Sequence, residues 1–576
     1  MTERTSLTGA RWTVAPVDEA HVAAMRALGP LREVTLRCMA LRGFDPNGGW
    51  LTPDVSQLLD PHTMLGMDQA IARLRQAIRD QQRIRVVTDY DVDGTTSSLI
   101  LQAALARLAP DLKVDYHIPD RFTEGYGFSV AAAQKAADDG VGLIVTADIG
   151  VRDHASVSAA RARGVDVLVC DHHLPAGESV PAEAIVLCPP QQGDPYGNRS
   201  LAACGVSLKL AEALLRDDPR RDVFREGLLK LAAIGTVADL VSIGTLENRA
   251  IVALGLAALN HGRHGPGLSA LLKVADCKPG EIDEVKLGWQ IGPRINAAGR
   301  IARATHVVEL LNCRDPDRAT VLAAELDALN RERRDIQGSL IDTVMSTLRE
   351  PYDSFVVVAG PEAEGWHRGI VGIVAARVKE TVNRPTAVVS IQGEFAVGSV
   401  RSVPSVHAVR ALDSVADLLL KYGGHPMAAG FTVRAADLDS LRERLSRYVD
   451  EHAGESAMTA EHAADAVVRV DELDAGLLAE LRRLAPFGSG NTEPKLLVRN
   501  VMLSDLRTLG KEQQHLKCTL RRGPAPLELV WWNAAPHAAA LREGPVDLLA
   551  NLRENVWNGN RSLQLQVIDA RRATHP

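Results

Sequence analysis

Residues 83–94 read RIRVVTDYDVDG, a run rich in branched apolar residues followed by three aspartates and a glycine. The run at 83–88 predicts a buried β-strand, and residues 95–108 predict the helix that follows it. In an extended backbone, Asp89, Asp91 and Asp93 would project to the same side. A nucleotide-binding protein commonly places glycines at this point, so three carboxylates require another explanation.

Three further strand-like runs follow, and helices separate them. The runs lie at 113–118, 142–147 and 165–170, with helices predicted at 129–138 and 153–163. This alternation indicates βαβ units and a parallel sheet covered on both faces. Ligands of such sheets lie beyond the carboxyl ends of the strands, so polar residues directly after each run form the candidate site.

Side chains of the kinds that bind metals also follow two of these further runs, and one more lies in a helical segment. They are Asp148, Asp171, His172, His173 and Asp239. Two unit charges about 4 Å apart repel by roughly 4 kcal/mol at an effective dielectric of 20, so such a cluster requires cations or protons. Carboxylates with one or two imidazoles suit Mn²⁺ or Mg²⁺. More than four acids suit a pair of ions that hydrolyses phosphoesters or phosphoanhydrides.

Each motif also has an ordinary structural explanation. An aspartate after a strand can cap the next helix, and DHH can be a cap followed by two surface histidines. Asp239 lies in an apolar setting, where a buried acid needs a partner. The coincidence of such residues at three strand ends favours a metal site over these separate explanations.

Composition places the chain among globular, multi-domain proteins. Its 576 residues are 46 % hydrophobic and 24 % charged, which predicts three or four domains. No apolar run approaches the roughly 18–20 residues of a membrane span, and residues 1–20 lack a signal-peptide core, so we expect a cytoplasmic protein without a membrane partner. The seven dispersed cysteines argue against a cysteine zinc site. The net charge of −7 excludes a basic footprint over the whole molecule, although local basic stretches remain.

Five segments describe the organisation that the sequence predicts. They are a helical lead-in at 1–80, the parallel-sheet domain at 81–270, a helical connector at 271–352, a second α/β domain at 353–455 and a β-rich domain at 466–576. The connector includes a long helix at 319–350. Five short strand-like runs in the last segment are typical of a small oligonucleotide-binding (OB) barrel.

The motifs DYDVDG, TADIG, DHH and GTVADLV together resemble those of the DHH phosphoesterase superfamily, and the chain resembles its RecJ family over nearly the whole length. Further similar segments are DRFTEGYGFS (120–129), LAACGVSLKL (201–210), GPRINAAGR (292–300), GWHRGIVGIVAARV (365–378), GSVRSVPSVHAVRAL (398–412), GGHPMAAGFTV (423–433) and LAPFGSGNTEPKLLV (484–498). Ile149 and Cys204 depart from the family pattern, and neither is a proposed ligand.

The resemblance implies an α/β fold in which a parallel-sheet DHH domain and a DHH-associated α/β domain are joined by a long helix and followed by a C-terminal OB-like β-barrel. It implies a single-strand-specific 5′→3′ exodeoxyribonuclease that releases 5′-mononucleotides in DNA recombination and repair. The implied cofactors are two Mn²⁺ or Mg²⁺ ions. The implied partners of a monomeric enzyme are single-stranded DNA, single-strand-binding protein and a repair helicase.

The same resemblance assigns roles to individual residues. One ion would be held by Asp91 and Asp148 with a contribution from Asp89, and the other by Asp93, Asp148, His172 and Asp239. His173 would face the scissile phosphate, and Asp171 would orient an imidazole. Candidates for binding the 5′-phosphate are Arg121, Arg294, Arg300, Ser399, Arg401, Ser402 and His425. Candidates for base stacking are Trp531, Trp532 and Trp557, and at most one of the adjacent pair can be exposed.

Two other functions stay open at this point. The chain could be a superfamily relative acting on pyrophosphate, cyclic dinucleotides or short oligonucleotides. It could also be an inactive nucleic-acid-binding scaffold, although the intact set of ligand residues counts against this. For each arginine the ordinary alternative is a solvated surface role, for His425 a structural turn, and for each tryptophan a core position.

Overall fold

The computed structural model describes residues 5–175, 177, 179–454, 458–521, 526–557 and 559–573. The chain forms two compact units. One, the parallel-sheet unit, combines Val17–Asn330 with Ala479–Glu493, and the other, the mixed-sheet unit, combines Met1–Pro16, Arg331–Leu478 and Pro494–Pro576. Within the described ranges, no helix has the length and apolar composition that a membrane crossing requires.

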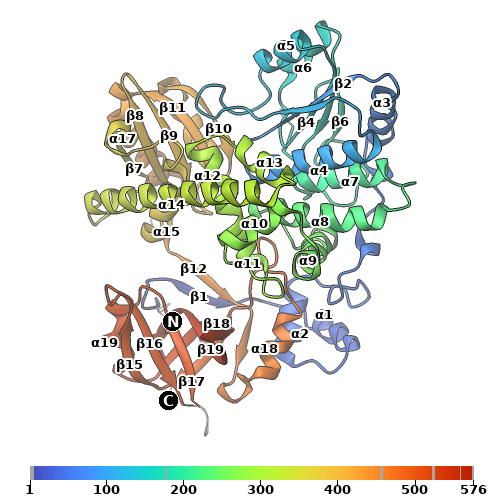
Figure 1. Cartoon of the computed structure of the whole chain (residues 1–576). Helices are drawn as coiled ribbons and strands as arrows, with labels where there is room; N and C mark the ends of the chain where they lie inside the picture. Colours follow the sequence, from blue (N-terminus) through green and yellow to red (C-terminus); the bar gives the residue numbers. More distant parts are fainter. Residues whose placement is uncertain are drawn as a thin grey trace. The chain divides into compact units, whose positions relative to one another are not determined.

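The parallel-sheet unit is built on five parallel strands in the order β3-β2-β4-β5-β6 (Figure 1). They are β2 (Arg83–Thr88), β3 (Val114–His117), β4 (Val141–Ala147), β5 (Asp166–Cys170) and β6 (Ile185–Leu187). After β2 the chain adds β3 on one side and β4 on the other. The carboxyl ends of β2 and β4 therefore form the switch point at which open parallel sheets bind ligands.

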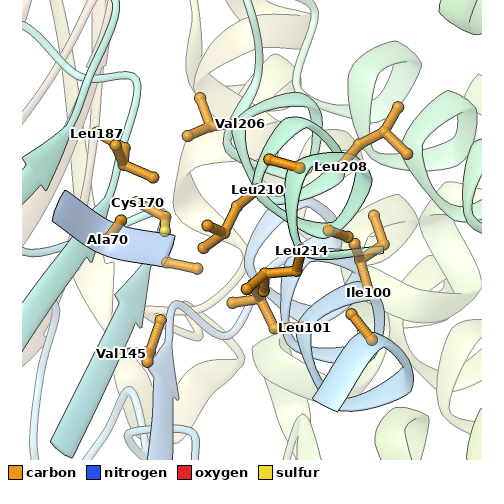
Figure 2. Packing of buried hydrophobic residues seen from close by; sticks show 14 of the residues in the cluster. Ala70, Ile100, Leu101, Val145, Cys170, Leu187, Val206, Leu208, Leu210 and Leu214 are labelled. Atoms are coloured by element: carbon orange, nitrogen blue, oxygen red, sulfur yellow. The ribbon is translucent and has the colours of Figure 1, made fainter. Parts of the chain in front are cut away.

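Helices cover both faces of this sheet, as the alternation of the strands requires. The surrounding helices are α3 (Met67–Arg79), α4 (Val92–Leu108), α5 (Val130–Asp138), α6 (His154–Ala162) and α7 (Ala203–Leu214). Val86 packs in the cluster with α3, α4 and α7, whereas its neighbour Val87 packs in the cluster with α5 and α6. Figure 2 shows Leu210 of α7 in the first cluster with Val145 and Cys170 of the sheet. Each such buried side chain contributes roughly 1.5–3 kcal/mol.

Further helices complete this unit. They are α1 (Glu19–Met25), α2 (Glu33–Leu41), α8 (Arg221–Ala238), α9 (Leu246–His261), α10 (Pro266–Val274), α11 (Glu284–Lys286), the π-helical turn η4 (Leu287–Ile291), α12 (Gly292–Ile301) and α13 (Thr305–Asn312). Buried Arg249 of α9 donates hydrogen bonds to the carbonyl oxygens of Trp50 and Leu484 at 2.8 and 2.7 Å. It thereby fixes the segment Ala479–Glu493 to this unit. The long helix α14 (Pro316–Thr347) continues the chain from one unit into the other.

The mixed-sheet unit contains two larger sheets. The first has the order β10-β11-β9-β8-β7 and consists of β7 (Val356–Pro361), β8 (Thr386–Gln392), β9 (Phe395–Arg401), β10 (Leu419–His425) and β11 (Ala428–Arg434). Its helices are α15 (Val371–Val382), α16 (Ala408–Asp413) and α17 (Leu438–His452). Only the pair β7–β8 in this described sheet is parallel.

The second sheet has seven strands in the order β13-β14-β18-β19-β17-β16-β15. They are β13 (Ala466–Val468), β14 (Leu496–Val501), β15 (Leu503–Leu509), β16 (His515–Leu520), β17 (Leu527–Trp531), β18 (Val546–Trp557) and β19 (Asn560–Arg572), with helix α19 (Ala538–Arg542). Helix α18 (Ala475–Arg482) begins in this unit and continues the chain into the parallel-sheet unit. Strands β1 (Arg11–Val14) and β12 (Glu461–Ala464) form a separate parallel pair.

These elements confirm the predicted α/β architecture with a long helix and a C-terminal β-domain. One detail of the sequence reasoning is wrong, because residues 89–93 are not extended throughout. Helix α4 begins at Val92, and the Asp91 carboxylate caps it by accepting a hydrogen bond from the Gly94 N–H at 3.1 Å. The three aspartates are therefore placed by a strand end, a helix cap and a first helical turn.

Candidate active site

The DYDVDG segment turns sharply between β2 and α4, and Gly94 permits the turn. A Cβ atom at residue 94 would lie 2.4 Å from the carbonyl oxygen of Asp89, so a larger residue does not fit. Asp93 is fully buried, and its carboxylate accepts hydrogen bonds from the Ala203 and Cys204 N–H groups at 2.7 and 2.8 Å. The first turn of α7 thus holds Asp93 in place.

Six predicted ligand residues, together with His173, converge at the carboxyl ends of the sheet. Three groups have ligand atoms that all lie within 4.8 Å of one another: Asp89, Asp91 and Asp148; Asp93, His172 and Asp239; Asp148, His172 and His173. Nε2 of His172 lies 3.2 Å from Asp148 Oδ1, 3.7 Å from Asp239 Oδ2 and 3.8 Å from Asp93 Oδ2. The groups share residues and therefore form one continuous cluster.

Asp148 occupies the centre of this cluster with an unusual backbone conformation. It follows β4 directly, and its φ of 64° lies in the left-handed region that non-glycine residues seldom adopt. Its N–H donates to the Cys170 carbonyl at 3.0 Å, which fixes the residue beside the end of β5. Backbone strain of this kind is concentrated at functional sites.

The cluster has more negative charge than its surroundings can stabilise. Burial raises the pKa of Asp89, Asp148 and Asp239 well above the ordinary value, and the neighbouring carboxylates raise it further. Within the described part of the chain, Oδ1 of Asp89, Oδ1 of Asp148 and Nε2 of His172 are buried and have no hydrogen-bond partner. Unpaired carboxylate oxygens and an imidazole nitrogen are the ligand atoms of Mn²⁺ and Mg²⁺ sites, so these residues fit such ions.

Asp171 lies beneath the cluster and orients its neighbouring imidazole. Its carboxylate accepts hydrogen bonds from three backbone N–H groups and from Nδ1 of His173 at 2.8 Å. Burial alone would raise the pKa of Asp171, but these hydrogen bonds and the nearby imidazoles hold it below its ordinary value. An ionised Asp171 requires Nδ1–H on His173. Nε2 of His173 then faces the Tyr126 hydroxyl at 3.4 Å, a contact for which the sequence holds no signal.

The predicted arginines of the parallel-sheet unit have different surroundings. Arg121 lies over the Tyr90 ring at 4.2 Å, beside the cluster, and Arg300 is half-buried at the end of α12. Arg294 instead pairs with Asp327 at 3.0 Å and donates to the Gln290 carbonyl at 2.7 Å. Its guanidinium is therefore engaged within the fold.

The GSVRS strand forms a second candidate site in the mixed-sheet unit. Arg401 Nη1 donates to Ser399 Oγ at 3.0 Å, and burial lowers the pKa of Arg401. A Cβ on Gly372, in the first turn of α15, would lie 3.0 Å from Ser399 Oγ and 3.2 Å from Arg401 Nη2. A helix N-terminus with an adjacent arginine and hydroxyl group is a favourable site for phosphate.

Strand register places His425 on the same face as Arg401. Arg401 and His425 both pair with Ala428, so they lie two strands apart, about 10 Å at the backbone. Ser402 differs, because its buried hydroxyl donates to the Val406 carbonyl at 2.6 Å. Of the four predicted residues, Ser399, Arg401 and His425 share this face, with only the small Ala428 between the last two.

The two adjacent tryptophans predicted to stack on bases differ in solvent exposure, as neighbouring positions on a strand require. Trp531 is 6 % exposed and stacks on His537, whereas Trp532 is 52 % exposed and contacts His515 edge-on. The side chain of Trp557 lies outside the described part of the structure. Trp532 is thus the member of the adjacent pair that faces solvent.

Three family models match successive parts of the chain. The DHH family N-terminal domain matches residues 83–236, the DHHA1 domain matches 353–451 and the RecJ OB domain matches 464–569. These ranges contain the cluster apart from Asp239, the GSVRS strand and the exposed tryptophan, respectively.

Curated relatives are similar over nearly the full length. The single-stranded-DNA-specific exonuclease RecJ of Bacillus subtilis is 35 % identical and the match covers 97 % of this chain and 70 % of that protein. RecJ of Escherichia coli is 35 % identical, covering 90 % of this chain and 92 % of that protein.

Solved structures of RecJ also match this chain over nearly its full length. RecJ of Thermus thermophilus in complex with Mn²⁺ matches with a TM-score of 0.83 and 29 % identity, covering 100 % of this chain and 81 % of that one. Its Mg²⁺ complex matches with a TM-score of 0.78 and 29 % identity, covering 98 % of this chain and 79 % of that one.

Proposed function

The chain belongs to the RecJ family, and from this premise we propose that it removes 5′-mononucleotides successively from the 5′ end of single-stranded DNA. It is a metal-dependent, single-strand-specific exonuclease of the DHH class. One observation carries the proposal for the site: buried carboxylates and an imidazole converge at the switch point of the sheet, and Oδ1 of Asp89, Oδ1 of Asp148 and Nε2 of His172 form no hydrogen bond within the described part of the chain.

Two divalent ions fit this cluster. The residues that would hold them are Asp89, Asp91 and Asp148 for one ion, and Asp93, Asp148, His172 and Asp239 for the other. When bound, such ions activate a water molecule and stabilise charge on the oxygens of the scissile phosphate. The protein supplies a fixed arrangement: N–H groups of α7 hold Asp93, and a left-handed turn holds Asp148.

His173 would contact the scissile phosphate directly. Burial alone would lower the pKa of His173, but the hydrogen bond from Nδ1–H to Asp171 raises it, so the protonated ring would donate from Nε2 to a phosphoryl oxygen, beside the Tyr126 hydroxyl. Donors fixed where charge develops lower the barrier of the reaction. Asp171 acts through His173, by holding its ring orientation and stabilising its protonated form.

The 5′→3′ polarity is proposed to come from the mixed-sheet unit. Arg401, Ser399 and the N-terminal turn of α15 would bind a terminal 5′-phosphate, with His425 on the same face. A terminal phosphate has more charge and more acceptor oxygens than an internal one, so this site favours strand ends. Trp532 of the β-domain would stack on a base farther along the strand.

Partners and location are proposed from family membership. Single-stranded DNA is the substrate, and single-strand-binding protein and a repair helicase would act with the enzyme in recombination and repair. We propose that it works as a monomer in the cytoplasm.

Strands labelled at either end test the polarity and the substrate. With Mn²⁺ or Mg²⁺, a 5′-labelled 30-mer should release labelled mononucleotide at once, whereas a 3′-labelled one should shorten gradually. Degradation that begins at the 3′ end, or that is equal on a blunt duplex, would contradict the proposal. Turnover of dinucleotides without turnover of the 30-mer would indicate the small-substrate alternative, and no turnover of either would indicate a scaffold.

A further inference from the structure

One wall of the parallel-sheet unit runs alongside the metal-ligand cluster. It consists of residues 284–301, which form α11, η4 and α12. At one end α12 packs on the DYDVDG segment, since a Cβ on Gly299 would lie 2.5 Å from the carbonyl oxygen of Tyr90. At the other end η4 packs on the last turn of α8, since a Cβ on Gly288 would lie 3.7 Å from Cγ1 of Val237. The wall therefore contacts both segments that flank the cluster.

Two large apolar side chains are exposed at this wall and beside it. Trp289, on η4, is 80 % exposed, and Leu240, directly after the ligand candidate Asp239, is 73 % exposed. Leu240 has a left-handed φ of 61°, which leucine seldom adopts, and Trp289 lies on a π-helical turn. Strained residues and π-helical turns are both concentrated at ligand sites. Both side chains are exposed to solvent, so packing in the core of the unit does not account for them.

We propose that Trp289 and Leu240 form a binding subsite for an unpaired nucleobase of the DNA strand, next to the nucleotide that is cleaved. This inference rests on the proposed function. An indole face stacks on any base, so the subsite would be tolerant of sequence. In an intact duplex the base faces are covered by neighbouring pairs, so the subsite would also favour single strands.

The charges of the wall support a base rather than a phosphate at this position. Arg294 pairs with Asp327 at 3.0 Å, and Lys286 lies 3.5 Å from Glu281. These two cations have acidic partners within the protein, and the third cation of the wall, Arg300, lies at the end of α12 far from Trp289, so the part of the wall near Trp289 presents an exposed apolar surface. The scissile phosphate of the strand would instead be bound by the metal centre.

Single abasic positions in the substrate test this subsite. The initial cleavage rate (kcat/KM) would be measured with Mn²⁺ on 5′-phosphorylated 12-mers of thymidine, each with one abasic position at successive places from the 5′ end. For the wild type, we expect a loss of about ten-fold at one position near the 5′ end. On the intact strand, Trp289→Ala should be about ten-fold slower than the wild type, and an abasic site at the sensitive position should slow it no further. Trp289→Phe should retain most of the wild-type dependence on the abasic position.

Val223→Ala is the matched control. Val223 is 61 % exposed on the first turn of α8, at the opposite end of the helix from Asp239, so its removal should leave the profile unchanged. Thermal unfolding would verify that each variant is folded. An unchanged profile in Trp289→Ala, with an active wild type, would overturn the subsite and leave the patch to a protein partner. An inactive wild type would overturn the proposed function, and the subsite with it.

Discussion

Replacing Asp148 by asparagine should have opposite effects on stability and on activity. The ligand atoms of Asp148, Asp89 and Asp91 lie within 4.8 Å of one another. At the outer limit of this range two ionised carboxylates repel by about 3.5 kcal/mol at an effective dielectric of 20, so with all three groups ionised two such neighbours oppose folding by about 7 kcal/mol. Protons and solvent relieve most of this repulsion. Without metal, Asp148→Asn should therefore be more stable than the wild type by about 1–3 kcal/mol.

The side-chain shape and the backbone both permit this substitution. Asparagine has nearly the same shape and tolerates the φ of 64° at residue 148. Urea unfolding would be followed by circular dichroism in EDTA and in Mn²⁺, beside hydrolysis of single-stranded DNA. The wild type should gain about 2.7 kcal/mol when Mn²⁺ is present at 100 times its dissociation constant. Asp148→Asn should gain much less, and its hydrolysis should fall by at least about 100-fold.

Asp115→Asn provides the contrast. Asp115 on β3 accepts hydrogen bonds from Arg83 and Arg85, at 2.6 and 2.7 Å, so its charge is paired. Its loss should destabilise the protein by about 1–3 kcal/mol, equally with and without metal. The reasoning is refuted if Asp148→Asn is less stable than the wild type in EDTA, or if Mn²⁺ stabilises both proteins alike.

Two further substitutions and one pH titration test other parts of the molecule. Gly235→Ala would place a Cβ 2.5 Å from Cys204 Sγ, so it should cost about 1–3 kcal/mol in thermal unfolding and lower hydrolysis; wild-type behaviour would contradict the packing described. Arg401→Ala should reduce kcat/KM about 10- to 100-fold on 5′-phosphorylated strands and much less on 5′-hydroxyl strands, and equal losses would exclude the phosphate site. Burial would raise the pKa of Asp115, but hydrogen bonds from the arginines lower it below 3.8. The contribution of Asp115 to the free energy of unfolding should therefore be complete above about pH 4 and decline as the pH falls further. Urea unfolding measured at a series of pH values should show a smaller decline for Asp115→Asn than for the wild type.

The sequence predicted the elements that place the ligands because each has a local signal. β2 and β4 are short apolar runs ending in aspartate, and covalent continuity places Asp89 and Asp148 at one edge of a parallel sheet. Even so, the prediction of an extended backbone from Asp89 to Asp93 was wrong, because helix α4 begins at Val92. A strand and a capped helix start give similar local patterns, and the capping hydrogen bond to Gly94 decides between them.

Contacts between distant segments had no signal in the sequence. Ala203 donates to Asp93 across 110 positions of the chain, and only the folded unit shows that α7 starts there. Arg294 pairs with Asp327, on α14, a contact that the sequence did not indicate. The exposure of Trp289 could not be predicted from the sequence either, because aromatic residues at helical spacing are more often buried.

Anomalous scattering from a Mn²⁺-soaked crystal of the wild-type protein tests the central claim most directly. We expect two manganese peaks at the carboxyl ends of β2 and β4, one bound by Asp89 and Asp91, the other by Asp93, His172 and Asp239, and both by Asp148. Manganese peaks elsewhere, or none in this cluster of an enzyme that hydrolyses single-stranded DNA, would contradict it.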